Sequence, residues 1–166
     1  KWGVTCPEKL LGDFAFGIWD SKQQKIFCAR DHFGIRPFYY YHDPGRIFVF
    51  ASEPRAILVL KQIPYRINEA RIADFLITQL EGIDKTSTFF KDVYRLPPAH
   101  LLAITPTRIK HQQYWSLEPG PELKLESDEA YAEAFLEVFT EAVHCRLRGN
   151  GLVGSMLSSG MDSGSI

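Results

Sequence analysis

Hydrophobic residues in the first two thirds of the chain fall in short runs that are separated by polar turns. Apolar residues at 14–19 and 26–29 flank a polar segment at 20–24, and those at 38–41 and 47–51 flank Asp43, Pro44 and Gly45. Two apolar runs on either side of a turn predict a β-hairpin. Because the runs are nearly continuous rather than alternating, we expect these strands to be covered on both faces.

Helical periodicity begins after the second hairpin. Ser52 is expected to cap a short helix over residues 53–60, and Asn68 to cap a second helix, because both side chains accept hydrogen bonds from first-turn N–H groups. Residues 101–105 predict a further strand, and residues 112–115 predict its partner. The positions that repeat at helical spacing in the second helix are Ile72, Phe75, Leu76 and Gln79.

The hydrophobic pattern lapses between residues 116 and 126, where Pro119, Gly120 and Pro121 stand among charged residues. This composition is typical of a linker. We therefore expect one domain over residues 1–115, a linker over 116–126 and the start of a second domain over 127–166. Ser127 would cap a helix that runs to about Arg148 and is stopped by residues 149–151. The buried stripe of that helix would consist of Tyr131, Phe135, Val138, Phe139 and Ala142.

Residues 153–166 combine an apolar run with a cluster of Ser and Gly. The run at 153–157 predicts a strand, and the cluster predicts a tight turn that opens a helix. Such a turn directs several backbone N–H groups into a small volume, which suits a polyphosphate. Asp162 could hold Mg²⁺ beside the phosphate oxygens. The alternative is an ordinary turn, since the common phosphate-loop pattern with its lysine is absent.

The composition of the chain argues against some classes of binding partner. With 166 residues, 45% apolar and 13% aromatic, the chain can form a packed core. A formal net charge of −1 provides no basic surface for a nucleic-acid backbone, so we expect no nucleic-acid partner. The apolar residues at 10–19 are interrupted by Asp13 and lack a small-residue cleavage site, which argues against a signal peptide and a membrane span. We therefore expect a cytoplasmic protein without a membrane partner.

The histidines and cysteines carry no recognisable site. The five histidines occur singly, without the spacing of metal ligands, so we expect no histidine metal site. Three cysteines without C-x-x-C spacing argue against a disulfide framework and a structural zinc site. Cys6 and Cys28 have no base readable beside them, and we interpret both as buried apolar residues rather than nucleophiles.

Two polar pairs directly follow hydrophobic strands: Arg30 with Asp31, and Ser52 with Glu53. Charged groups at such positions are costly unless they are paired. We interpret both pairs as structural groups that bind each other or the loop backbone. The alternative is that they shape a site at the edge of the sheet.

Short motifs are spread over almost the whole chain. They are Leu-Gly-Asp-Phe-Ala-Phe at 11–16, Ala-Arg-Asp at 29–31 with Gly-Ile-Arg-Pro at 34–37, Ala-Ser-Glu at 51–53, Leu-Pro-Pro at 96–98 with His100, Tyr-Trp at 114–115 and Leu-Ser-Ser-Gly-Met-Asp-Ser at 157–163. Together they resemble the glutamine-hydrolysing asparagine synthetase family. The earlier motifs resemble any class II glutamine amidotransferase. The last is similar to the S-G-G-x-D-S loop of an ATP pyrophosphatase domain and favours the asparagine synthetases.

The resemblance implies an α+β part followed by an α/β part. The first would be the C-terminal portion of a four-layer αββα N-terminal-nucleophile hydrolase domain, which releases ammonia from glutamine. The second would be the first helix, strand and phosphate loop of a parallel-sheet ATP pyrophosphatase domain. There, aspartate and ATP would form an aspartyl adenylate, which ammonia attacks to give asparagine, AMP and pyrophosphate.

The resemblance also implies which residues bind ATP and Mg²⁺. Asp162 would lie near Mg²⁺, and Leu157 would lie against the nucleotide while the residues after it hold the pyrophosphate. The ATP-binding residues implied are Leu157, Ser158, Ser159, Gly160, Met161, Asp162 and Ser163.

The chain departs from the family pattern at several points. Ser159 and Ala99 stand where the family usually has Gly, and residues 151–152 read Gly-Leu where Val-Pro is common. The family's nucleophile, a Cys at the mature N-terminus, has no counterpart here, so no catalytic residue is assigned. We therefore expect an internal fragment of a longer enzyme, without glutaminase activity of its own.

Two alternatives stay open. The same loop serves other amide-forming enzymes, such as the β-lactam synthetases and lasso-peptide cyclases. The chain could instead be a truncated, non-catalytic binding module. If the chain is part of a longer enzyme, that enzyme could form a homo-oligomer.

Overall fold

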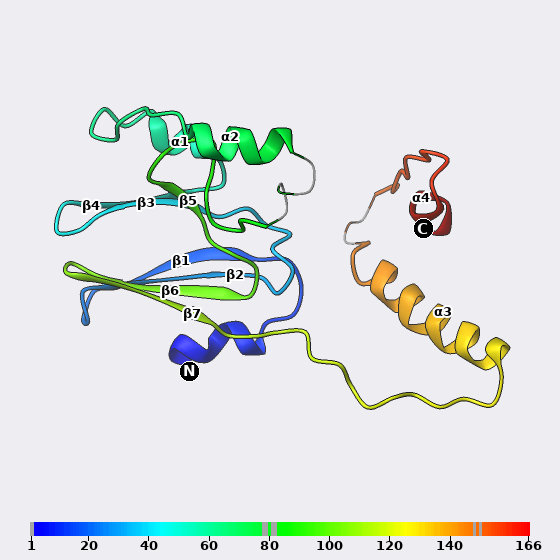
Figure 1. Ribbon diagram of the computed structural model, residues 1–166. Coiled ribbons are helices and arrows are strands. Elements are labelled where there is room, and N and C mark those ends of the chain that lie inside the picture. Colours follow the sequence, from blue (N-terminus) through cyan, green and yellow to red (C-terminus); the bar gives the residue numbers. More distant parts are fainter. Residues whose placement is uncertain (1, 78–79, 81–82, 148, 150) are drawn as a thin grey trace. The chain divides into compact units, whose positions relative to one another are not determined.

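The computed structural model describes the chain except for residues 1, 78–79, 81–82, 148 and 150 (Figure 1). The described residues form two compact units, Lys1–Glu118 and Pro119–Ile166. Each unit is considered by itself below. Among the described residues, no helix is both long enough and apolar enough to cross a bilayer.

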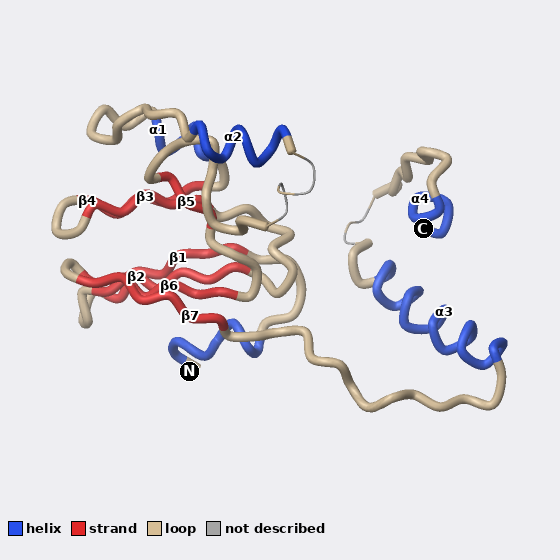
Figure 2. The backbone as a smooth tube through the Cα atoms, in the orientation of Figure 1, coloured by secondary structure: helices blue, strands red, loops and turns tan. Residues whose placement is uncertain are grey.

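The first unit is a small α+β domain with two antiparallel sheets, which lie one over the other in Figure 2. One sheet has the strand order β1-β2-β6-β7 and the other β4-β3-β5. Helices α1 and α2 cover the outer face of the smaller sheet (Figure 1). The elements are η1 (Gly3–Lys9), β1 (Ala15–Asp20), β2 (Lys25–Arg30), β3 (Tyr39–Asp43), β4 (Ile47–Ala51), α1 (Pro54–Leu58), α2 (Glu69–Leu76), β5 (Val93–Arg95), β6 (His100–Thr105) and β7 (Arg108–Gln113).

Alternating side chains of these strands serve different apolar layers. Along β2, Cys28 belongs to the cluster between the sheets, while Phe27 and Ala29 belong to the cluster on the outer face. Along β3, Tyr40 faces the intersheet cluster and Tyr41 joins a third cluster with α1. A strand presents successive side chains to opposite faces. The continuous apolar runs of β2 and β3 therefore reflect strands that are covered on both faces.

Both predicted hairpins are confirmed, β1 with β2 and β3 with β4. Coverage on both faces is confirmed for β2 and is wrong for β1, where Ile18 is 51% and Trp19 54% exposed. The reason is position, because β1 lies at the edge of its sheet. The predicted partner of β6 is also confirmed, although β7 begins and ends earlier than residues 112–115.

The two predicted helix caps in this unit have different outcomes. Asn68 does cap α2, since its side chain accepts a hydrogen bond from the N–H of Arg71. The prediction for Ser52 is wrong: Glu53 occupies the N-cap of α1, without a side-chain cap bond. Proline at the first position of α1 needs no partner for a missing N–H, which removes part of the need for a cap. Gln79 lies outside the described residues.

The second unit contains α3 (Asp128–His144) and α4 (Met161–Ser165). Ser127 caps α3 as predicted, accepting a hydrogen bond from the N–H of Ala130 at 3.2 Å. The helix ends at His144 rather than near Arg148, which lies outside the described residues. The expected burial of its apolar stripe is wrong, because α3 has no buried residue and Phe135 is 69% exposed.

The predicted strand at 153–157 is also wrong. These residues are described but belong to no strand, and Met156 and Leu157 are exposed. A strand exists only through hydrogen bonds to a neighbouring strand. None of the strands in the described part of the chain pairs with this run.

Candidate functional site

Arg30 and Asp31, at the end of β2, anchor the loop that leads to β3. The guanidinium of Arg30 donates hydrogen bonds to the carbonyl oxygens of Arg36 at 2.7 Å, of Leu96 at 2.6 Å and of Gly34. Each of these bonds joins a charge to a neutral carbonyl, and such bonds are stronger than neutral ones. One side chain thus ties β2 to its own loop and to the segment after β5.

The carboxylate of Asp31 complements this arrangement from the other side of the loop. It accepts hydrogen bonds from the N–H groups of Ile35 and Arg36, both at 2.9 Å, and of Phe33 at 3.2 Å. The N–H of Asp31 donates to the carbonyl of Phe14, and its own carbonyl accepts from Ala99. Asp31 is 2% exposed, so its burial depends on these partners.

The electrostatics of the loop follow from its burial. Desolvation lowers the pKa of Arg30, and the neighbouring Asp31 offsets part of that shift. Gly34 allows the close approach, since its φ is +68° and an added Cβ would lie 2.9 Å from Arg30 Cζ and 2.9 Å from Pro98 Cγ. The structural interpretation of Arg30 and Asp31 as backbone ligands is therefore confirmed.

An aromatic cluster beside this loop is invisible in the sequence pattern. The ring of His32 makes edge-on contacts with Tyr114, at a centroid distance of 5.4 Å, and with Trp115 at 5.1 Å. The hydroxyl of Tyr114 donates to the carbonyl of Arg30 at 2.7 Å. In the sequence, only the Tyr-Trp motif at 114–115, through its resemblance to the family pattern, indicates these residues. Residues 52 and 53 take no part in the cluster, and both are exposed.

The predicted burial is confirmed for Cys28 and is wrong for Cys6, which is only half-buried. Cys28 is fully buried between the sheets, and desolvation raises the pKa of its thiol to about 12. Burial also raises the pKa of Cys6. Neither thiol is therefore poised as a nucleophile. Within the described ranges, no group of His, Cys, Asp and Glu side chains is arranged to hold a metal ion.

The loop at 157–163 closes on itself through serine hydroxyls. Ser163 Oγ accepts a hydrogen bond from the N–H of Ser158 at 3.1 Å, lies 3.0 Å from Ser158 Oγ and donates to the carbonyl of Gly160 at 3.1 Å. Gly160 is the N-cap of α4, and Met161 begins the helix. The predicted turn that opens a helix is thus confirmed, although the strand before it is not.

The side chains of this loop are of the kinds that can bind a phosphate. The segment is exposed, its serines carry hydroxyl donors, and Asp162 lies in the first turn of α4. Ser159 has a φ of +60°, in the left-handed region that favours glycine. The departure from Gly at this position therefore carries backbone strain. The assignment of residues 157–163 to ATP and of Asp162 to Mg²⁺ stays a prediction.

Comparison with known proteins gives relatives along the whole chain. A Methanocaldococcus jannaschii protein, provisionally named asparagine synthetase (glutamine-hydrolyzing) 2, is 33% identical over 169 residues, which cover 100% of this chain and 32% of the relative. Asparagine synthetase (glutamine-hydrolyzing) 3 of Bacillus subtilis is 31% identical over 170 residues, covering 100% of this chain and 26% of the relative. Amidase chry2 of Gibberella zeae is 33% identical over 168 residues, covering 99% and 24%.

The chain therefore spans about a third or less of the length of these relatives. The predicted similarity to glutamine-hydrolysing asparagine synthetases is confirmed by the first two. A family described as glutamine amidotransferase domain matches residues 1–115, which include both sheets of the first unit. The protein belongs to this glutamine amidotransferase domain family.

Proposed function

We propose that residues 1–166 are part of an ATP-dependent ligase that converts aspartate to asparagine with ammonia from glutamine. The observation that carries the proposal is the similarity to asparagine synthetases over 100% of the chain, which extends beyond the amidotransferase match at residues 1–115 to the loop at 157–163. An amidotransferase domain supplies ammonia, and an ammonia-using enzyme needs an activated acceptor. The sequence after residue 115 is where we place that activation.

ATP supplies the activation by transferring AMP to the aspartate carboxylate, with release of pyrophosphate. The carboxylate oxygen forms a bond to the α-phosphorus, and the bond to the β-phosphate bridge breaks. Ammonia then forms the amide bond at the carboxyl carbon, and AMP leaves. A carboxylate is a poor acceptor for an amine until its oxygen becomes part of such a leaving group, and the developing charges need electrostatic stabilisation.

In this proposal the residues of the loop hold the pyrophosphate. The hydroxyls of Ser158 and Ser163 already lie within hydrogen-bond distance of each other and would donate to phosphate oxygens. Asp162 would hold Mg²⁺ through its carboxylate, which is the ligand type that this ion prefers. Arg30 and Asp31 have a supporting role in the same protein, because they fix the fold of the amidotransferase part.

The proposal is tested by isotope exchange between pyrophosphate and ATP in the full-length protein that carries this sequence. We expect exchange that depends on aspartate and Mg²⁺. Asp162→Asn should lower the exchange rate at least about tenfold, because it removes a charge from the metal site. The matched control is Asp128→Asn, at an exposed first-turn position of α3, which should leave the rate unchanged. Exchange that needs another carboxylic acid and ignores aspartate would exclude an asparagine synthetase.

A second candidate function has a specific observation in its favour. The name of the Gibberella zeae relative is amidase chry2, and its identity of 33% equals that of the M. jannaschii protein. That name refers to an amide bond and does not mention aspartate, and the loop at residues 157–163 also resembles that of other amide-forming enzymes. We therefore infer, as the second candidate, that the same domains form an amide on a carboxylate other than aspartate. A panel of carboxylic acids in the exchange assay separates the two candidates.

A further inference from the structure

The segment that joins the two units is held at its first end by Trp115, which follows β7. The indole ring of Trp115 lies edge-on to the ring of His32, at a centroid distance of 5.1 Å, and to that of Phe33 at 5.6 Å. Its carbonyl accepts a hydrogen bond from Gln113 Nε2 at 3.0 Å. Aromatic pairs of this geometry stabilise a structure beyond the burial of their surface. Trp115 is therefore fixed within the first unit.

The preceding residue, Tyr114, strengthens this end through two hydrogen bonds. Its N–H donates to the carbonyl of Ala99 at 2.9 Å, and its hydroxyl donates to the carbonyl of Arg30 at 2.7 Å. One bond fixes the backbone and the other fixes the side chain. The path of the chain is thus determined up to Trp115.

The other end of the segment is held by Tyr131, near the start of α3. The hydroxyl of Tyr131 donates to the carbonyl of Leu123 at 2.9 Å and accepts from the N–H of Leu125 at 3.0 Å. A phenol hydroxyl can donate and accept at the same time, so one side chain satisfies two backbone groups on either side of Lys124. Residues 123–125 are therefore fixed to α3 within the second unit.

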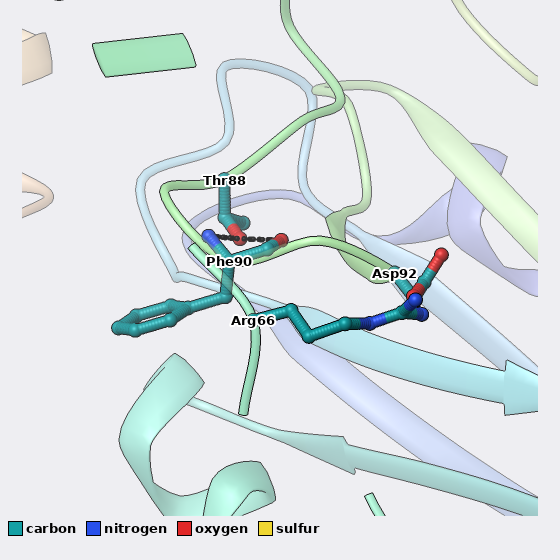
Figure 3. A network of polar contacts seen from close by, with 4 residues as sticks. All are labelled: Arg66, Thr88, Phe90 and Asp92. Carbon is teal, nitrogen blue, oxygen red and sulfur yellow. Dashed lines mark hydrogen bonds and ion pairs between the residues drawn. The ribbon is translucent and has the colours of Figure 1, made fainter. Parts of the chain in front are cut away.

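A loop inside the first unit shows how a connection is held by its own polar contacts. Figure 3 shows Thr88, whose hydroxyl accepts a hydrogen bond from the N–H of Phe90 at 3.1 Å. In the same view, Arg66 forms an ion pair with Asp92. The backbone supports this pairing, since the N–H of Lys91 donates to the carbonyl of Arg66 at 2.8 Å.

The middle of the segment between the two units lacks such contacts. Residues 117 and 119–121 are exposed, and none of them forms a hydrogen bond or an ion pair with any residue that the structure describes. The two units divide within this stretch, after Glu118. A Cβ added to Gly120 would meet no atom within 4 Å, so this glycine has space to change its backbone conformation. An exposed backbone without fixed partners rearranges at little free-energy cost.

The two glutamates of this stretch make only surface contacts. Glu118 accepts a hydrogen bond from Ser116 Oγ at 2.7 Å, and Glu122 lies 3.5 Å from Lys124 Nζ. Exposed pairs of this kind contribute little, because water and salt screen them. Neither contact therefore fixes the backbone.

We propose that the connection between the two units is a hinge confined to residues 117–122, with Trp115 and Tyr131 as the residues that fix its ends. Any change in the orientation of the units is then produced by backbone rotation within this stretch. Residues up to 115 move with the first unit, and residues from 123 onward move with the second. Hinges are typically a few residues that absorb large φ and ψ changes. The proposal holds for either candidate function, because it depends only on the segment and its anchors.

The test is residue-resolved hydrogen exchange, read by mass spectrometry, on the full-length protein that carries this sequence. We expect the amide hydrogens of Leu117, Gly120 and Glu122 to exchange as fast as in an unfolded peptide. Those of Tyr114 and Leu125 should exchange at least about tenfold more slowly, because both are hydrogen-bonded. Uniform exchange from residue 114 to residue 125, whether fast or slow, would overturn the hinge.

A conservative pair of variants tests the anchor on α3. Tyr131→Phe keeps the ring and removes the hydroxyl, so exchange at Leu125 should rise about fivefold or more, since the amide loses its acceptor. Tyr65→Phe changes an exposed tyrosine of the first unit in the same way and should leave exchange at Leu125 unchanged. An unchanged rate at Leu125 in Tyr131→Phe would show that Tyr131 does not hold this end.

The anchor at the end of β7 is tested separately. Trp115→Ala removes the ring contacts with His32 and Phe33, and exchange at Tyr114 should rise about fivefold or more. Leu117→Ala, at an exposed position inside the hinge, is the control and should leave exchange at Tyr114 unchanged. Equal effects of the two substitutions would contradict the role of Trp115. If Trp115→Ala does not fold, the exchange pattern of the unsubstituted protein decides the question.

Discussion

The two positions at which this chain departs from a family glycine share one backbone conformation. Ala99 has a φ of +57° and Ser159 a φ of +60°, both in the left-handed region. L-residues with a Cβ pay roughly 1–2 kcal/mol there, and glycine does not. The sequence alone shows only that a side chain is present, whereas the structure explains why glycine is preferred at each position.

Ala99→Gly should therefore stabilise the protein. We expect a gain of about 0.5–1 kcal/mol in the free energy of unfolding, since relief of the left-handed strain outweighs the added freedom of glycine in the unfolded chain. Urea denaturation measures the change. The matched control is Ala103→Gly within β6, which should destabilise because a strand interior gains nothing from glycine. A loss of stability at both positions would contradict the strain at Ala99.

Loss of Arg30 should destabilise the first unit strongly, because its guanidinium binds three backbone carbonyls. Arg30→Met removes the donor from three backbone carbonyls and leaves the buried Asp31 without its neighbouring charge. We expect a loss of about 3–5 kcal/mol, the range seen when one partner of a buried charged network is removed. Denaturant unfolding measures it, with the exposed Arg108→Met as control, for which a change within about 0.5 kcal/mol is expected. A similar small effect at Arg30 would show that the loop holds without it.

At the scale of elements, local pattern predicts the hairpins and fails for pairings between distant segments. Turn residues identified β1–β2 and β3–β4. Strand β6 pairs with β2, and β5 pairs with β3, although each pair is far apart in the sequence. A local hydrophobic pattern does not show which distant strands will pair. For the same reason the apolar run at 153–157 predicts a strand that the structure does not contain. The aromatic cluster around His32 also joins segments far apart in sequence.

Asn68 caps α2 and Ser52 does not cap α1, so substitutions at these two positions form a test and its control. Asn68→Ala should destabilise the first unit by about 1 kcal/mol, because α2 loses its cap and the side chain also donates to the carbonyl of Thr88. Ser52→Ala should change stability by less than about 0.5 kcal/mol, since Ser52 is exposed and does not cap α1. Thermal unfolding of both variants measures the difference. Equal effects would mean that Asn68 contributes nothing as a cap.

The carboxyl group of Asp84, in the turn at residues 84–87, should make the free energy of unfolding depend on pH in the acid range. Burial raises the pKa of Asp84, but hydrogen bonds from Ser87 and Thr86 together outweigh it and hold the pKa well below its usual range. A carboxyl whose folded pKa is depressed stabilises the fold above its unfolded pKa of about 4, and this contribution is lost as the pH falls through the folded pKa. Asp84→Asn should therefore flatten the fall in unfolding free energy below about pH 4. An unchanged slope in urea titrations at several pH values would contradict this role.

At the scale of the whole molecule, the two units differ in how far they support a functional conclusion. The first has three buried apolar clusters and a family match over residues 1–115. The second contributes the loop at 157–163 and an exposed α3. We propose from motif similarity that this loop binds ATP, and its serine hydroxyls are chemically compatible with a phosphate ligand. The proposed activity of the whole protein therefore depends on ATP-dependent activation of a carboxylate, which an enzymatic assay must test.

The most direct measurement is the product balance of the full-length protein with aspartate, ATP, Mg²⁺ and either ammonium or glutamine. Activation through AMP predicts asparagine, AMP and pyrophosphate in equal amounts. Formation of ADP and phosphate, or an amide of another acid with aspartate left unchanged, would contradict the assignment of this chain to an asparagine-forming ligase.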